Sequence, residues 1–104
     1  MIYSVRLAAQ GAISSLTTVY TAPSTAVIVV RDVIITNQYG ASASYFGFVV
    51  VSGVGLLAWT TGTLAADTAY SWQGRLVLAA GDVLQFQPNG TGSCAVLISG
   101  YSLT

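Results

Sequence analysis

The chain has 104 residues, a formal net charge of zero and a mean hydropathy of +0.73, and 6% of its residues are charged. An ordinary soluble domain is about 25% charged, and this sequence contains no His, Lys or Glu. Because these side chains do most of the proton transfer in enzymes, the composition argues against catalysis. So few charges give little electrostatic repulsion between molecules. We therefore expect copies of the chain or a larger assembly to cover much of its surface.

Length and residue usage narrow the class further. About 100 residues correspond to one domain, which we expect to span residues 1–104. The basic side chains are Arg6, Arg31 and Arg75, too few to neutralise a nucleic-acid backbone. Cys94 has no second cysteine with which to form an intrachain disulfide, so it is expected to be a small buried apolar residue.

The uncharged centre of the chain raises the question of a membrane. No charge occurs between Val33 and Ala66, and within this stretch Tyr45–Trp59 is apolar except for Ser52 and the glycines. That segment is shorter than the ~20 residues a membrane-spanning helix needs. Its Val, Gly and aromatic residues favour strands over helices. We therefore expect no transmembrane helix, and we expect no signal peptide because polar residues follow Arg6.

Strand-like periodicity runs through the whole chain, with turn residues about every ten positions. Gln10-Gly11 is one such predicted turn, and Leu64–Asp67 is expected to form one short turn. In chain order, the predicted strands are Ile2–Leu7, Leu16–Tyr20, Ala26–Asn37, Tyr45–Val51, Leu56–Trp59, Ala69–Gln73, Arg75–Leu78, Val83–Gln87 and Ala95–Leu103.

Alternation within the strands predicts which faces are buried. Val83–Gln87 alternates apolar and polar residues, which is typical of a half-exposed strand. It follows Arg75–Leu78 across Ala79–Asp82, a glycine-containing loop of hairpin length. Ala26–Val30 and Tyr45–Val51 are apolar on both faces, so we expect a second subunit to cover their outer faces.

Arg31 and Asp32 are adjacent in the longest predicted strand. Neighbours in a strand point to opposite faces, so each is expected to find its partner elsewhere. Nine short strands with glycine-rich turns predict an all-β protein, a single-domain antiparallel β-sandwich of jelly-roll or Greek-key kind.

Few residues could carry chemistry. Asp67 and Asp82 could form a carboxylate pair as in glycosidases, but Asp82 is already explained by its turn. A zinc site lacks its His and Cys ligands, and no Asp-rich loop offers a calcium site. We therefore expect neither catalytic residues nor a metal or other cofactor.

The aromatic residues of the central region are the remaining candidates for binding. Tyr and Trp are enriched at protein interfaces, so these rings are expected to fill the core or a contact between subunits. The predicted contact segments are Ile2–Leu7 and Tyr39–Phe48, with Ile2, Tyr3, Tyr39, Tyr45, Phe46 and Phe48 as the candidate residues. In the alternative interpretation, Trp59, Asp67 and Trp72 form an exposed platform that stacks on a glycan.

Several stretches carry a resemblance to small structural proteins of tailed bacteriophages. Tyr20-Thr21-Ala22-Pro23 forms a turn that leads into the long strand Val27–Ile35 with its Arg31-Asp32. The stretch Gly74–Leu84 with its Gly-Asp turn and the ending Val96–Leu103 resemble the same proteins. This chain departs from the usual pattern at Tyr45–Trp59, where a more polar strand pair is typical.

The resemblance implies a virion component, either a capsid decoration protein or an accessory piece of the tail or head–tail region. We expect it to assemble in the host cytoplasm and to reside in the virion, without binding nucleic acid or a membrane. We expect a homo-oligomer, with a trimer favoured, that cements capsid or tail subunits. The alternative is a glycan- or receptor-binding module at a tail tip.

Overall fold

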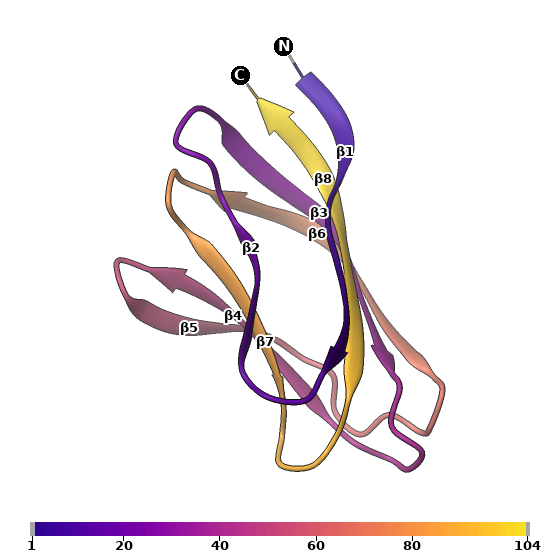
Figure 1. Ribbon diagram of the computed structural model, residues 1–104. Coiled ribbons are helices and arrows are strands. Elements are labelled where there is room, and N and C mark those ends of the chain that lie inside the picture. The colour runs from indigo at the N-terminus through magenta and orange to yellow at the C-terminus, as the bar shows by residue number, and fades with distance from the viewer. Residues whose placement is uncertain (1, 104) are drawn as a thin grey trace.

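Two four-stranded antiparallel sheets pack face to face in the computed structural model (Figure 1). It describes the backbone of residues 2–103 and the side chains of residues 6–103. Within residues 2–103, no helix is long and apolar enough to cross a membrane. The predicted all-β sandwich is confirmed. Its strands are β1 (Ile2–Ile13), β2 (Thr17–Thr21), β3 (Val27–Asn37), β4 (Tyr45–Val51), β5 (Val54–Thr60), β6 (Ala69–Leu78), β7 (Val83–Pro88) and β8 (Cys94–Leu103).

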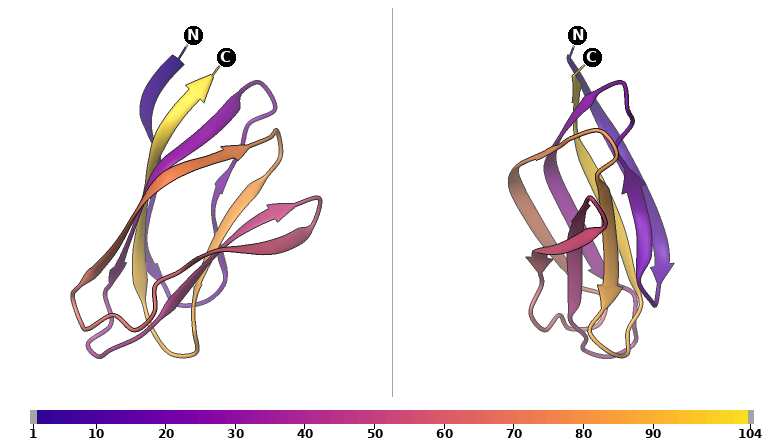
Figure 2. Two further views of the ribbon diagram at one scale, coloured as in Figure 1. Left: turned by 180° about the vertical axis from the view of Figure 1, so that it is seen from behind. Right: turned by 90° about the vertical axis from the view of Figure 1, so that its left-hand side faces the viewer.

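The strand order is that of a jelly roll. The first sheet runs β1-β8-β3-β6 and the second runs β2-β7-β4-β5. The pairs β1/β8, β2/β7, β3/β6 and β4/β5 form one long antiparallel ribbon whose successive pairs alternate between the sheets. The first and last strands lie side by side, since Ile2 pairs with Leu103, and the hairpin of β4 and β5 closes the other end of the ribbon (Figure 2).

Three aromatic rings join the two sheets in the core. The Trp59 ring stacks on Phe86 with centroids 5.6 Å apart, and it meets Trp72 of the first sheet edge-on at 5.4 Å. Gly47 makes room for this cluster: a Cβ atom there would lie 2.6 Å from Phe86 Cε1 and 2.7 Å from Trp59 Cε3. A side chain at this position would therefore push the rings apart.

Asn37 is a fully buried polar residue at the end of β3. Its side-chain nitrogen donates to the carbonyls of Ala41 at 3.0 Å, Leu64 at 3.1 Å and Ala65 at 3.2 Å. Its side-chain oxygen accepts from the backbone N–H of Tyr39 at 2.9 Å. One amide thus satisfies the backbone of two loops, the one after β3 and the one after β5, which would otherwise bury unpaired groups.

Tyr45 extends this network to a third loop. Its hydroxyl donates to Asn37 Oδ1 at 2.7 Å and accepts from the backbone N–H of Ser93 at 3.2 Å. Burial raises the pKa of Tyr45, so the hydroxyl remains a protonated donor in the neutral range. The loops after β3, β5 and β7 are therefore held together at one end of the sandwich.

Residues 2–103 form eight strands where nine are predicted, because Ala69–Gln73 and Arg75–Leu78 form the single strand β6. Gly74 continues the strand instead of breaking it. A Cβ atom at Gly74 would lie 2.6 Å from the Trp72 ring, so the glycine leaves space for that ring to fold over the strand.

The predicted turn at Gln10-Gly11 is also wrong, since β1 continues to Ile13. The register with β8 shifts between Gln10 and Ile13, and Ala12 takes a positive φ of 54°. The backbone N–H of Ala12 donates to Gln38 Oε1 at 3.0 Å. The glycine thus marks a β-bulge, which bends the strand without ending it.

The predicted hairpin across Ala79–Asp82 is wrong as well. β6 pairs with β3 in the first sheet, whereas β7 pairs with β2 and β4 in the second. Leu78 and Leu84 are both fully buried, one from each sheet. The short loop is therefore a crossover that lets both strands face the same core. The expected alternation of burial in Val83–Gln87 is confirmed.

The outer face of β3 is partly covered within the chain, since Val27 is 44% exposed but Val29 is buried. Val29 is 7% exposed, and its neighbours across the sheet are Tyr101 and Val77. Its burial does not need the second subunit that the sequence led us to expect. On β4 the outward residues Phe46, Phe48 and Val50 remain half-buried, so there the outer face is still partly open.

Replacing Asn37 with Ala tests the buried network. We expect Asn37→Ala to lower the free energy of unfolding by about 3 kcal/mol, since each buried polar group left without a partner costs about 1–3 kcal/mol. Urea denaturation measures the change. Asn89→Ala, in an exposed turn, is the matched control and should change the free energy of unfolding by less than about 0.5 kcal/mol. Equal stability of the two variants would contradict the role given to Asn37.

Candidate interaction surfaces

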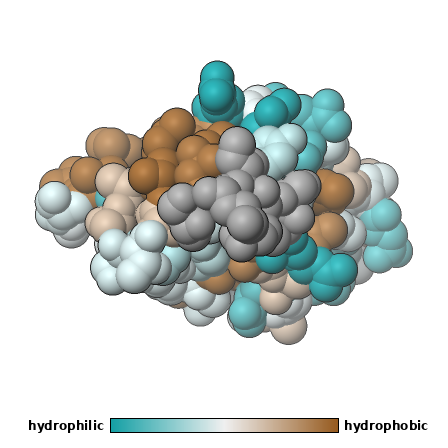
Figure 3. Space-filling view, turned by 90° about the horizontal axis from the view of Figure 1, so that it is seen from above, coloured by the Kyte–Doolittle hydropathy of each residue, from teal (hydrophilic) through white to brown (hydrophobic). Residues whose placement is uncertain are grey.

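The hairpin of β4 and β5 exposes apolar side chains on both of its faces. Val51, Val54 and Leu56 are 39%, 59% and 53% exposed, and Leu57 is 58% exposed. Seen from above, hydrophobic residues gather on the side from which this hairpin projects (Figure 3). We call these four residues the hairpin patch. Soluble monomers rarely expose a large apolar patch, and such patches generally mark interaction sites.

A bulge explains how the hairpin patch arises. Gly47 pairs with Trp59 and Phe48 pairs with Leu57, so Ala58 is an extra residue in β5. The bulge lets Trp59 and Leu56 both face the side of the core. Trp59 reaches the first sheet and is 2% exposed, whereas Leu56 lies nearer the hairpin tip, where no strand covers it.

An apolar groove lies between the hairpin and the first sheet. It has a volume of about 430 Å³ and is lined by Val49, Val51 and Leu56 on one side and by Leu76 and Val77 of β6 on the other. Figure 2 shows the two layers diverging toward this end. Asp82 is the one charged residue among those that line the groove.

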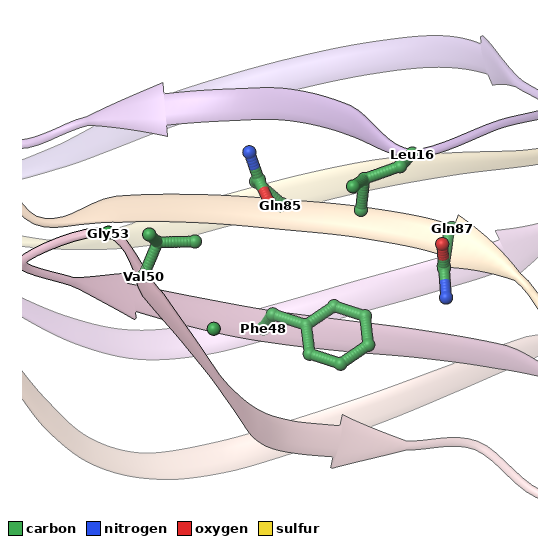
Figure 4. Close-up of a pocket in the computed structure, with 7 residues that line it drawn as sticks. Leu16, Phe48, Val50, Gly53, Gln85 and Gln87 are labelled. Carbon is green, nitrogen blue, oxygen red and sulfur yellow. The ribbon is translucent and has the colours of Figure 1, made fainter.

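A second hollow lies on the outer face of the second sheet. It has a volume of about 390 Å³, and Phe48, Gln85 and Gln87 line it together with Leu16 and the glycines of the hairpin (Figure 4). Gln85 Nε2 donates to Thr18 Oγ1 at 3.1 Å. This surface therefore combines an aromatic ring with side-chain amides from the neighbouring strand.

Covering the hairpin patch would be favourable. Full burial of a Val or Leu side chain is worth about 1.5–3 kcal/mol, so covering four side chains that are roughly half exposed offers on the order of 4 kcal/mol per chain. Association costs of similar size oppose this gain. A single contact on the patch is thus weak, and repetition of the contact in an assembly would strengthen it.

The predicted contact residues are placed unequally. Tyr39 is 36% exposed in the loop after β3, and the rings of Phe46 and Phe48 lie 6.4 Å apart on the half-open outer face of β4. Tyr45 is fully buried, and its hydroxyl is committed to Asn37 and Ser93; as a contact residue it was wrongly predicted. Ile2 and Tyr3 lie in β1, but their side chains are outside the described part of the structure.

The predicted glycan platform does not form at the surface. Trp59 and Trp72 do come together, but in the core, with Trp59 2% exposed and stacked on Phe86. Asp67 lies in an exposed turn with a positive φ of 60°. A platform needs an open ring face, and Phe86 of the same sheet stacks on the face of Trp59.

Sequence reasoning missed Val54, Leu56 and Leu57 as surface residues. Leu56-Leu57 places two large apolar side chains at consecutive positions, and consecutive residues of a strand point to opposite faces. The tight turn at Ser52-Gly53, followed by Leu56-Leu57, therefore indicates a hairpin that is apolar on both of its faces. Its exposure depends on the edge position of β5, which the sequence pattern does not encode.

The charged residues of β3 have partners within the chain, as expected. The Arg31 guanidinium lies 5.6 Å from the centre of the Tyr101 ring, a cation–π distance, and Ser99 Oγ donates to Asp32 Oδ2 at 3.5 Å. Among the described residues, no group of three or more Cys, Asp or Glu side chains lies close enough to hold a metal ion. These residues support the sheet and do not converge on a site.

Comparison of the sequence with known families finds no family model that matches, and comparison with curated proteins finds no match.

Burial makes Cys94 sensitive to alkali. Burial raises the pKa of this thiol from 9.0 to about 11, because the thiolate is poorly solvated in the core. Below pH 9 the thiol is protonated in both states and its contribution is complete. As the pH rises from 9 towards 11 the unfolded chain releases the proton first, so the free energy of unfolding should fall.

Urea denaturation between pH 8 and pH 10.5 tests this expectation, with Cys94→Ala as the comparison. The variant should be less stable than the wild type at pH 8. Its free energy of unfolding should fall less as the pH rises, because it has no buried thiol. Tyrosine ionisation lowers the stability of both proteins alike. Parallel pH dependences in the two proteins would contradict it.

Proposed function

We propose that this protein is a non-enzymatic structural component of a bacteriophage virion, which associates with itself and binds the capsid or the tail region. The observation that carries the proposal is the hairpin patch, which projects from a sandwich that is 6% charged. A monomer working alone in water gains nothing from this surface, whereas an assembly gains from covering it.

The fold is compatible with this role. Jelly rolls occur in viral capsid proteins and also in lectins. A fold by itself does not assign a function, so it supports both interpretations equally. The resemblance to tailed-phage structural proteins favours the virion, and the apolar, nearly uncharged surface favours contacts between proteins over contacts with phosphate or nucleic acid.

The mechanism would be cementing. The protein would bury apolar area against several neighbouring subunits, and each contact would add about 25 cal/mol per Å² before association costs. Symmetry would then bring the remaining contacts to high effective concentration once one is made. The favoured assembly is a trimer, with Phe46 and Phe48 as contact residues within the trimer or against the shell.

Two measurements test the proposal. An antibody against the protein should label virions purified from a host that carries the gene, and light scattering should give a mass above one chain. Phe48→Asp should reduce that mass or release the protein from virions while leaving the β-type circular dichroism spectrum unchanged, since the ring lies on the outer face. Absence from virions would contradict the proposal, and loss of the fold would make Phe48 a core residue.

The second candidate function is recognition of a glycan or receptor at a tail tip. The observation that favours it is the outer hollow, where the Phe48 ring lies near the amides of Gln85 and Gln87 (Figure 4). Sugars are held by aromatic faces together with planar hydrogen-bonding groups. In this candidate the outer hollow is the glycan site, in place of Trp59 and Trp72, whose rings pack in the core.

A glycan array and titration calorimetry distinguish this candidate. Binding to a sugar that Gln87→Ala weakens at least tenfold, with no change for Gln10→Ala on β1, would support it. We expect the fluorescence of the buried Trp59 to change little on binding. No binding across the array would contradict a glycan-binding role.

A further inference from the structure

We propose that β5 pairs edge to edge with β5 of a second copy of this chain about a two-fold axis. The pairing would join two second sheets into one continuous antiparallel sheet. This inference rests on the self-association proposed above and names the surface that would make it.

The edge of β5 is the least protected of the four edge strands in residues 2–103. Proteins block free edges with charges, prolines and bulges. β1 carries Arg6 and two register shifts, β2 has a register shift, and β6 carries Arg75. β5 contains no charge and no proline, and its residues Val54–Leu57 pair without interruption, the bulge at Ala58 coming only afterwards.

The side chains of β5 are self-complementary. An added strand must be apolar on both faces, because Leu56 and Val54 are exposed on one face and Leu57 on the other. β5 itself meets this requirement. In antiparallel pairing about a two-fold axis, each face of one strand continues into the same face of the other, so the two copies of Leu56 would lie together.

A dimer through β5 would have to cover more surface than the strand edge itself. A standard interface removes about 800 Å² from each partner, about 15% of the 5412 Å² surface of this chain. Strand pairing alone covers less than this. The apolar groove beside Leu56 and the hollow beside Gly55 extend the available surface on either side of β5.

The symmetry of this contact has a measurable consequence. A two-fold contact makes a dimer, or it joins two trimers into a hexamer. The number of chains in the assembly is therefore even. A lone trimer would have to be built on other surfaces, such as Tyr39 and the outer face of β4.

Light scattering on the full chain, with charged variants, tests the pairing. The wild type should give the mass of two or six chains. The double variant Leu56→Lys, Leu57→Lys should halve that mass, because four ammonium groups would meet across the axis. Leu97→Lys, at a position that is 38% exposed on the first sheet, should leave the mass unchanged. Circular dichroism checks that each variant is folded.

Single cysteine substitutions keep the test decisive if the lysine variant fails to fold. Oxidation of Val54→Cys, Leu56→Cys or Leu57→Cys should give a covalent dimer in at least one case, since symmetric positions near the axis approach closely. Leu97→Cys should give none. The native Cys94 is fully buried with a raised pKa, so it contributes little background.

The outcomes separate the two proposals. A trimer, or an oligomer whose mass the lysine variant leaves unchanged and whose β5 cysteines do not cross-link, would overturn the β5 pairing and leave self-association standing. A wild type that stays monomeric at millimolar concentration would overturn both. In that case virion labelling alone would decide whether the protein is a monomeric virion component.

Discussion

The hydrogen bond between Asn37 and Tyr45 holds the closed end of this jelly roll. Through it, one buried amide and one buried hydroxyl satisfy the backbone of three loops that come from different parts of the chain. An apolar residue could fill the same space but would leave those backbone groups unpaired. With this end held shut, the sheets are free to diverge towards the other end, where the hairpin patch and the apolar groove lie (Figure 2).

The aromatic cluster sets the limit of that divergence. Trp59, Phe86 and Trp72 span the two sheets, and Gly47 gives the rings their space. Towards the hairpin tip no ring bridges the layers, so Leu56 and Val54 have the inward direction of core residues without a core to contact. The hairpin patch is thus the continuation of the core beyond the point where the sandwich is closed.

An exposed continuation of a core suits a protein that works by being covered. With 6% charged residues, the chain has little electrostatic means of choosing a partner or of staying apart from its copies. Partner selection then depends on shape and on backbone hydrogen bonding, and a free strand edge supplies both. Weak contacts of this kind become effective when symmetry repeats them, which is the situation of a protein on a virus particle.

The sequence by itself determined the sandwich class and most of the strands and buried faces, because alternation of apolar residues is a local property of each strand. It also placed Cys94 in the core, whereas the structure decided that the partners of Arg31 and Asp32 lie in this chain. Only the tertiary structure decided which strands share a sheet, so that β6 and β7 lie in different sheets despite a loop of hairpin length. It also decided which inward-pointing residues lie opposite a strand of the other sheet. Trp59 and Leu56 face the same way, and one is buried while the other is exposed, because burial depends on which distant strand lies opposite, and local periodicity carries no record of that strand.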